Sequence, residues 1–234
     1  MKKQNISITD LNSRKKRAEI VNRELKKLFP RAKIALKFSN EWELLVAVVL
    51  SAQSTDKQVN IVTEKLFKKY KTLDDYVNAE IKEFEKDIYS TGFYHNKAKN
   101  ILATAKIVKE IHGGKIPCTM EELIRLPGVA RKTANIVLGN ACGVVVGIAV
   151  DTHVKRLSNV LGLTTEQNPD KIEKDLMQIL PKEWFEFTYR LIDYGRAYCI
   201  AKKHDHENCP ITKVLEEQPN PSSPLGRGNE GEGN

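Results

Sequence analysis

The sequence predicts an all-α protein. Apolar residues recur at intervals of three and four along most of the 234 residues, and no long stretch alternates between apolar and polar side chains. Hydrophobic residues make up 41% of the chain and charged residues 29%, which is typical of a globular protein. The longest unbroken apolar run, 44–50, is far shorter than the roughly 20 residues of a membrane helix, so no membrane span is expected.

Each predicted helix is marked by an apolar stripe, except that 42–52 is apolar all round, which is typical of a buried helix. Pro30 ends the first helix, and a pair of glycines at 113 and 114 ends the fourth. The β-branched segment 144–150 is short and could be extended. In chain order, the predicted helices lie near 18–28, 42–52, 59–70, 98–108, 121–125, 131–141, 154–160, 172–179 and 184–198.

The two ends of the chain differ from its middle. Residues 1–13 are polar, which predicts a flexible N-terminus, and residues 217–234 hold three Pro, four Gly and no aromatic residue, which predicts a disordered tail. The net charge of +8 favours a polyanionic partner. No apolar segment follows the basic N-terminus, and four cysteines are too few for a disulfide scaffold, so we expect a cytoplasmic protein.

The segment 126–134, Leu-Pro-Gly-Val-Ala-Arg-Lys-Thr-Ala, predicts a hairpin between two helices. Pro127 and Gly128 suit a tight turn. The helix that follows begins with free N–H groups, which suit a phosphate anion. An ordinary turn is the alternative, but Arg131 and Lys132 in a basic helical chain favour phosphate binding.

Lys132 and Asp151 are the candidate catalytic residues. Lys132 lies about 200° around its helix from Ala134, off the apolar stripe, so it is either a solvated lysine or a nucleophilic amine. Asp151 precedes a predicted helix and is either an N-cap or a carboxylate held opposite a developing positive charge.

These motifs resemble the endonuclease III family of helix-hairpin-helix DNA glycosylases with a Gly/Pro…Asp loop. Asp151 follows Lys132 by nineteen residues in Ala-Val-Asp-Thr-His, and 44–56, 92–98 and 194–201 match as well. The resemblance covers about residues 14–216. It implies a base excision repair DNA glycosylase with abasic-site lyase activity, which removes oxidised or damaged pyrimidines from duplex DNA through a lysine Schiff base and nicks the strand by β-elimination.

The resemblance also assigns roles to residues. Lys132 falls on the Schiff-base lysine and Asp151 on the catalytic aspartate. Gln53 falls on the residue that fills the gap left by an extruded base, and Phe93 on a wedge position beside it. The hairpin residues that would bind DNA are Pro127, Gly128, Val129, Ala130 and Arg131.

Two lobes that flank a DNA-binding cleft are implied by the same resemblance. One is a six-helix barrel at 34–144, with the helix-hairpin-helix near 121–141, and the other combines 14–33 with 145–216. We expect a monomer that binds double-stranded DNA. The alternatives are a mismatch-specific uracil or thymine glycosylase, which needs no amine, a non-catalytic helix-hairpin-helix DNA-binding protein, and a structural protein.

This sequence departs from the family in two places. Ala130 stands where a second glycine is usual, and if the turn needs a positive φ there, the phosphate grip would weaken. The family's cluster motif, Cys-x6-Cys-x2-Cys-x5-Cys, here carries Cys199, His206, Cys209 and Leu215. Only two thiolates remain, so we expect no metal and no four-iron cluster.

The remaining cysteines and histidines leave one question open. A remnant zinc site with Cys199, Cys209 and either His204 or His206 is the alternative to an empty loop, although the spacing matches no common zinc module. Cys118 and Cys142 stand alone, and we expect them to be small buried residues. The basic residues expected to face phosphates are Arg131, Lys155, Arg156 and Arg196.

Overall fold

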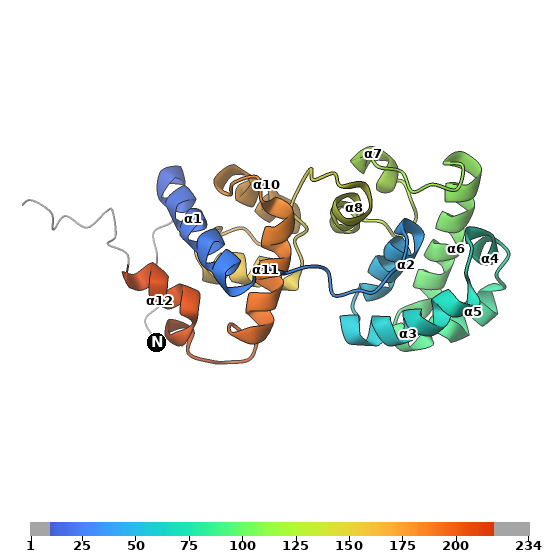
Figure 1. The fold of residues 1–234 in the computed structure, drawn as a ribbon, viewed down its shortest axis with the longest axis horizontal. Helices are drawn as coiled ribbons and strands as arrows, with labels where there is room; N and C mark the ends of the chain where they lie inside the picture. The colour runs from blue at the N-terminus through green and yellow to red at the C-terminus, as the bar shows by residue number, and fades with distance from the viewer. Residues whose placement is uncertain (1–9, 218–234) are drawn as a thin grey trace, which may run out of the picture. The chain divides into compact units, whose positions relative to one another are not determined.

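The computed structural model describes residues 10–217, and within this range it contains helices and connecting segments but no strand (Figure 1). The all-α prediction is therefore confirmed. The segment 144–150 is neither helix nor strand, and no helix in the described range is long and apolar enough to cross a membrane. The α-helices are α1 (Leu11–Leu28), α2 (Glu41–Ser51), α3 (Asp56–Lys69), α4 (Leu73–Val77), α5 (Ile81–Ile88), α6 (Tyr94–Ile111), α7 (Met120–Leu123), α8 (Arg131–Val137), α9 (Thr152–Val160), α10 (Pro169–Ile179), α11 (Trp184–Ala197) and α12 (Pro210–Glu217).

Three short elements complete the order: the 3-10 turns η1 (Tyr89–Thr91) and η3 (His206–Asn208), and a π-helical turn, η2 (Leu138–Cys142), which extends α8. The chain divides into two compact units. The central unit holds Lys33–Asp151 and Trp184–Tyr189, and the terminal unit holds the described residues before 33, Thr152–Glu183 and the described residues from 190 onward. Because 145–151 belongs to the central unit, Lys132 and Asp151 lie in the same unit.

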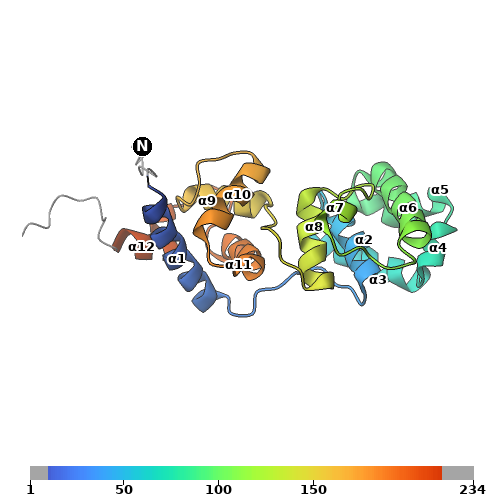
Figure 2. The same cartoon turned by 90° about the horizontal axis from the view of Figure 1, so that it is seen from above.

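Helix α2 forms the middle of the central unit. All seven residues from 44 to 50 are buried, as the apolar run predicts, because α3, α6 and α8 each pack against this helix (Figure 2). Fully burying one such side chain stabilises the fold by about 1.5–3 kcal/mol. Asn40 caps the helix start by accepting a hydrogen bond from the Glu43 amide at 2.9 Å. An edge-to-face contact between Trp42 and Tyr76, with ring centroids 5.2 Å apart, fastens α2 to α4.

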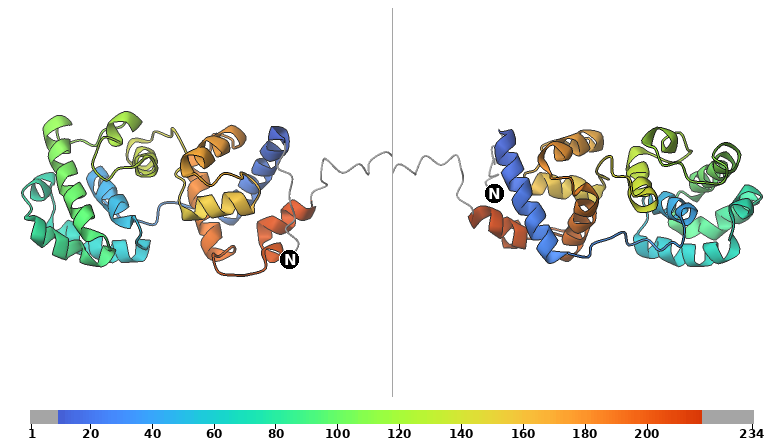
Figure 3. Two further views of the ribbon diagram at one scale, coloured as in Figure 1. Left: turned by 180° about the vertical axis from the view of Figure 1, so that it is seen from behind. Right: turned by 45° about the horizontal axis from the view of Figure 1, so that its top comes forward.

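The terminal unit joins the two ends of the described chain. Helix α1 lies beside α10 and α12 (Figure 3) and buries its apolar face of Ala18, Val21 and Leu25. Arg14 of α1 also donates to the main-chain oxygen of Leu163, in the segment between α9 and α10, at 2.8 Å. The helix begins at Leu11 because Asp10 caps it, so residues 11–13, expected to be flexible, are helical. Residues 1–9 and 218–234, where the remaining predictions of a flexible N-terminus and a disordered tail fall, lie outside the described range.

Candidate functional site

The predicted hairpin is present between α7 and α8, and α6 holds it in place. Gly128 has a φ of +77°, a value that favours glycine, and a Cβ added there would lie 2.9 Å from Nδ2 of Asn100 on α6. Thr104, one turn further along α6, donates to the main-chain oxygen of Pro127 at 3.0 Å. The turn therefore requires glycine at position 128 for both conformation and space.

Two hairpin residues differ from what the sequence suggested. Ala130 has a φ of −83° and a ψ of 168°, which is extended backbone open to any residue, so alanine is unstrained there. The predicted weakening by Ala130 therefore has no basis in the backbone of this turn. Val129 is only 5% exposed and packs in the core of the central unit, so its side chain anchors the hairpin and only its main chain can meet DNA.

Lys132 is exposed in the first turn of α8, whereas Ala134 and Val137 are buried, so the lysine points away from the apolar stripe as predicted. Asp151 is partly buried and directly precedes α9. The amide Nδ2 of Asn135, which lies one turn after Lys132, donates to the main-chain oxygen of Ile148 at 3.4 Å. That bond ties α8 to the segment that carries Asp151, and so places an exposed amine and a carboxylate on connected parts of one unit.

Gln53 and Phe93 share an unusual backbone conformation. Within the described residues they are the only non-glycine residues with positive φ, at 54° and 49° respectively. Both side chains are exposed, Phe93 by 64%. Such strained, exposed positions often serve binding.

A buried lysine connects these two positions. The Nζ atom of Lys97 donates to the main-chain oxygens of Leu50 and Thr91, each at 2.8 Å, and so links the end of α2 to the turn before α6. Burial lowers the pKa of Lys97 from its usual value. Lys97 was not among the predicted site residues, although a lysine one turn before Ile101, beside the apolar stripe of the same helix, was a signal that could have found it.

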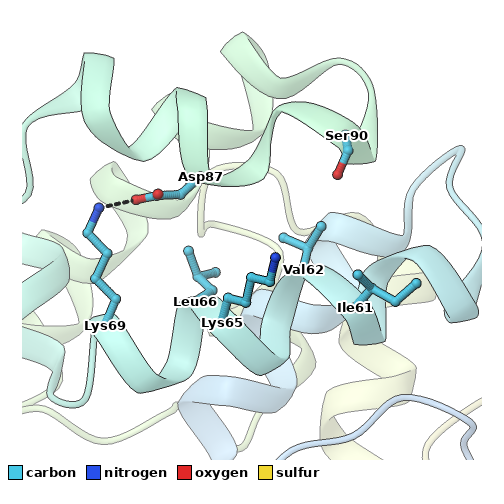
Figure 4. Close-up of a pocket in the computed structure, with 7 residues that line it drawn as sticks. All are labelled: Ile61, Val62, Lys65, Leu66, Lys69, Asp87 and Ser90. Carbon is cyan, nitrogen blue, oxygen red and sulfur yellow. Dashed lines mark hydrogen bonds and ion pairs between the residues drawn. The ribbon is translucent and has the colours of Figure 1, made fainter.

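A separate pocket lies elsewhere on the central unit, between α3 and α5 (Figure 4). Its walls carry apolar side chains and an ion pair between Lys69 and Asp87 at 2.6 Å. Hydrogen bonds to Asp87 and Glu83 raise the pKa of Lys69 above its usual value, which keeps this amine charged. None of the predicted site residues lines the pocket, so it is not part of the candidate site. The lining residues are Ile61, Val62, Lys65, Leu66, Lys69, Asp87 and Ser90.

The prediction that the chain holds no cofactor is wrong. Cys199, His204, His206 and Cys209 come together in the terminal unit, and their potential ligand atoms all lie within 4.8 Å of one another. The sequence offered His204 and His206 as alternatives for a single ligand position, whereas the structure places both in the group. Folding brings His204 into the group because the loop between α11 and α12 turns back on itself.

Arg156 also has a different role from the one expected. Its guanidinium does not stand free for phosphates but donates to the main-chain oxygen of Cys199 at 2.6 Å, with Nη1 3.6 Å from the Cys199 sulfur. This side chain therefore fixes the first residue of the Cys/His group in the terminal unit.

Cys118 and Cys142 were expected to be isolated, buried residues. This is wrong, because the two form a disulfide. Cys118 is exposed just before α7, and Cys142 ends the helix that begins with α8. The bond therefore closes a loop that contains the whole hairpin and Lys132. A pair of cysteines on either side of one predicted motif was the signal that the sequence offered for this pairing.

Comparison with known proteins places the chain in a family of DNA repair proteins. Residues 46–182 match the family model described as HhH-GPD superfamily base excision DNA repair protein. The chain is 48% identical over 203 residues to endonuclease III from Synechocystis sp., which covers 86% of this chain and 93% of that protein.

Solved structures agree with the sequence comparison. A non-covalent endonuclease III–DNA complex superposes with a TM-score of 0.81 at 43% identity and covers 86% of this chain and 94% of the other. A trapped endonuclease III–DNA covalent intermediate superposes with a TM-score of 0.80 at 44% identity, with coverages of 84% and 93%.

Proposed function

Because this chain belongs to the endonuclease III family of helix-hairpin-helix base excision DNA repair proteins, we propose that it removes damaged pyrimidines with Lys132 as the nucleophile. The chain is a base excision repair DNA glycosylase and abasic-site lyase that acts on double-stranded DNA. The observation that carries the assignment of Lys132 is its exposed position at the start of α8, directly after the hairpin.

Lys132 supplies the covalent step of this proposal. Its neutral amine attacks C1′ of the deoxyribose, the bond from C1′ to the base breaks, and the base leaves with the bonding electrons and takes up a proton. The nitrogen then loses one proton, the bond from C1′ to the ring oxygen breaks, the ring oxygen keeps the bonding electrons and takes up a proton, and a protonated imine forms. A proton is then removed from C2′, the bond from C3′ to oxygen breaks, and the 3′ phosphate leaves, which nicks the strand.

Asp151 faces the charge that develops during this step. As the base departs, positive charge grows on the sugar, and a fixed carboxylate stabilises it without reorganisation. The hydrogen bond from Asn135 to Ile148 supports this role, since it holds the Asp151 segment on the helix of Lys132. Removing one preorganised group of this kind typically slows a reaction by about 10²–10³-fold.

Gln53 and Phe93 contact the DNA stack in this proposal. Taking a base out of the duplex leaves a gap and breaks stacking on both sides. Gln53 fills the gap and Phe93 enters the stack beside it. Both side chains are exposed and both backbones are left-handed, so the residues project from sharp turns and not from helix faces.

The hairpin grips the backbone of the duplex. Arg131 and the main chain around Gly128 contact phosphates, which position the enzyme without reading sequence. These contacts predict a binding constant that falls as salt concentration rises. The same proposal places the protein in the cytoplasm in association with the nucleoid, since that is where bacterial DNA lies.

The test is borohydride trapping on a duplex with one abasic site. The wild type is expected to form a covalent adduct and Lys132→Ala none, whereas Lys106→Ala, which removes an exposed lysine from α6, should trap like the wild type. If Lys132→Ala still traps, Lys132 is not the nucleophile. If the wild type excises a base but forms no adduct, the hydrolytic mismatch glycosylase is the better description.

Substrate choice needs a second assay. Cleavage is measured on duplexes that carry thymine glycol, uracil opposite guanine, 8-oxoguanine or an abasic site. We expect the damaged pyrimidine and the abasic site to be cleaved fastest. Faster excision of uracil opposite guanine than of thymine glycol would overturn the proposal for damaged pyrimidines.

A further inference from the structure

Among the described residues 10–217, one group of three or more His, Cys, Asp or Glu side chains lies close enough together to hold a metal ion. It lies in the loop between α11 and α12, and the proposed repair chemistry does not use it. Its members are Cys199, His204, His206 and Cys209. We propose that these four side chains bind a single Zn²⁺ ion, which joins the end of α11 to the start of α12.

The distances between donor atoms suit one tetrahedral ion. The Cys199 sulfur lies 3.3 Å from Nδ1 of His206, and the Cys209 sulfur lies 3.3 Å from Nε2 of His204. Zinc bonds of about 2.3 Å to sulfur and about 2.0 Å to nitrogen put those atoms about 3.5 Å apart at the tetrahedral angle. The sulfur–nitrogen pairs thus already stand near the spacing that a shared ion imposes.

The protonation of His204 also suits a ligand. Its Nδ1 atom lies 2.8 Å from the main-chain oxygen of Lys202, and a carbonyl oxygen only accepts hydrogen bonds. The proton of the neutral ring is therefore on Nδ1, which leaves the lone pair of Nε2 directed at the side of Cys209. Metal-binding histidines commonly donate their other nitrogen to a carbonyl in this way.

Burial separates the two kinds of ligand. Cys199 and Cys209 are 1% and 3% exposed, His204 is partly buried and His206 is exposed. The sulfurs therefore form the floor of the site and the imidazoles its outer wall, where an ion can enter from solvent. With four protein ligands and no open position, the ion has a structural role.

The iron-sulfur cluster implied by the family resemblance does not fit this donor set. A four-iron cluster takes four thiolates, each on a different iron. Here two donors are imidazoles, and the fourth cysteine position is Leu215, which is buried on α12. Donor atoms that converge within 4.8 Å fit one ion.

Metal analysis of the purified full chain tests the proposal directly. We expect about one zinc per chain, with iron and acid-labile sulfide near zero. After chelation, added Co²⁺ should produce the visible absorption of tetrahedral cobalt with thiolate ligands. Stoichiometric iron with sulfide, or a chain that takes up neither Zn²⁺ nor Co²⁺, would overturn the proposal.

A pair of histidine variants provides the specific test. His206→Ala removes an exposed ligand and should fold, but we expect its zinc affinity to fall by more than the roughly 10–100-fold seen when an outer partner is lost. His112→Ala removes a histidine at the end of α6 and should keep the affinity of the wild type. Equal zinc binding and equal cobalt spectra in the two variants would contradict the site. Lyase activity is scored separately, so a failure of the proposed reaction leaves this result readable.

Discussion

The ammonium group of Lys97 lies 2.8 Å from the main-chain oxygen of Leu50, at the end of the helix that leads to Gln53. A second bond of 2.8 Å joins the same nitrogen to Thr91, just before Phe93. One buried cation therefore sets the spacing of the two exposed residues that we propose to enter the DNA stack. Lys97 is in this sense a positioning residue, since it acts through the turns that it holds.

Replacing this lysine should affect base removal more than strand nicking. Lys97→Met leaves two buried main-chain oxygens without their donor, a loss of about 1–3 kcal/mol each in the free energy of unfolding. We expect excision of a damaged base to slow by at least about tenfold, equivalent to about 1.4 kcal/mol in the barrier. Cleavage of a preformed abasic site, where no base must be extruded, should slow less.

The matched control is Lys99→Met, which changes an exposed lysine on the same helix. Both activities and the melting temperature of this variant should equal those of the wild type. If Lys97→Met slowed base excision and abasic-site cleavage by the same factor, Lys97 would have a purely structural role.

Gly128→Ala should weaken DNA binding. The new Cβ would lie 2.9 Å from Asn100. The φ of +77° would in addition cost any residue other than glycine about 1–3 kcal/mol of backbone strain. Since the hairpin contacts only the DNA backbone in our proposal, affinity should fall similarly for damaged and undamaged duplexes. Fluorescence anisotropy at fixed salt measures both.

Ala130→Gly tests the other position of the same turn. Its extended backbone accepts alanine without strain, so glycine should bring no gain in DNA affinity and should lower stability by at most about 1 kcal/mol. A clear increase in affinity would mean that alanine does restrict the hairpin when DNA binds.

Phe93→Ala should separate stability from function. The side chain is 64% exposed, so its removal leaves no cavity and should barely change the melting temperature. Base extrusion loses its wedge, and the fluorescence rise of 2-aminopurine placed beside the lesion should become slower or smaller. An unchanged fluorescence signal would remove Phe93 from the extrusion step.

Reduction of the disulfide between Cys118 and Cys142 should lower stability. The bond closes a loop with a sequence separation of 24, for which the loss of chain entropy predicts about 3.5 kcal/mol. The melting temperature of the wild type should therefore fall in a thiol reductant. The melting temperature of Cys118→Ser should lie near that of the reduced wild type and should not fall further in reductant. An equal fall of the melting temperature in both proteins would show that loss of the disulfide is not the cause.

Much of the helical framework followed from the sequence. The apolar run 44–50 predicted a buried helix, and α2 is buried along all of it. Pro127 and Gly128 predicted the hairpin between α7 and α8. These features depend on neighbouring residues, because hydrophobic periodicity and turn conformation are local properties of the chain. The motif around Lys132 and Asp151 could be recognised for the same reason.

Other features required the folded chain. The φ of Ala130 decided that the missing glycine causes no strain, and the path of one loop brought His204 to Cys209. One of the two hydrogen-bond partners of Lys97, the main-chain oxygen of Leu50, lies 47 residues away in the sequence.

The sequence by itself predicted the all-α class, the hairpin and nine of the twelve α-helices of the described residues, because each depends on side chains a few positions apart, but it did not predict α4, α5 and α12. Only the tertiary structure decided which groups meet: Lys97 with the carbonyl of Leu50, Cys118 with Cys142, and both His204 and His206 with the two thiols. The physical reason is that the packing of the helices in the core sets where each helix end lies, and residues a few positions apart in the sequence do not determine that packing.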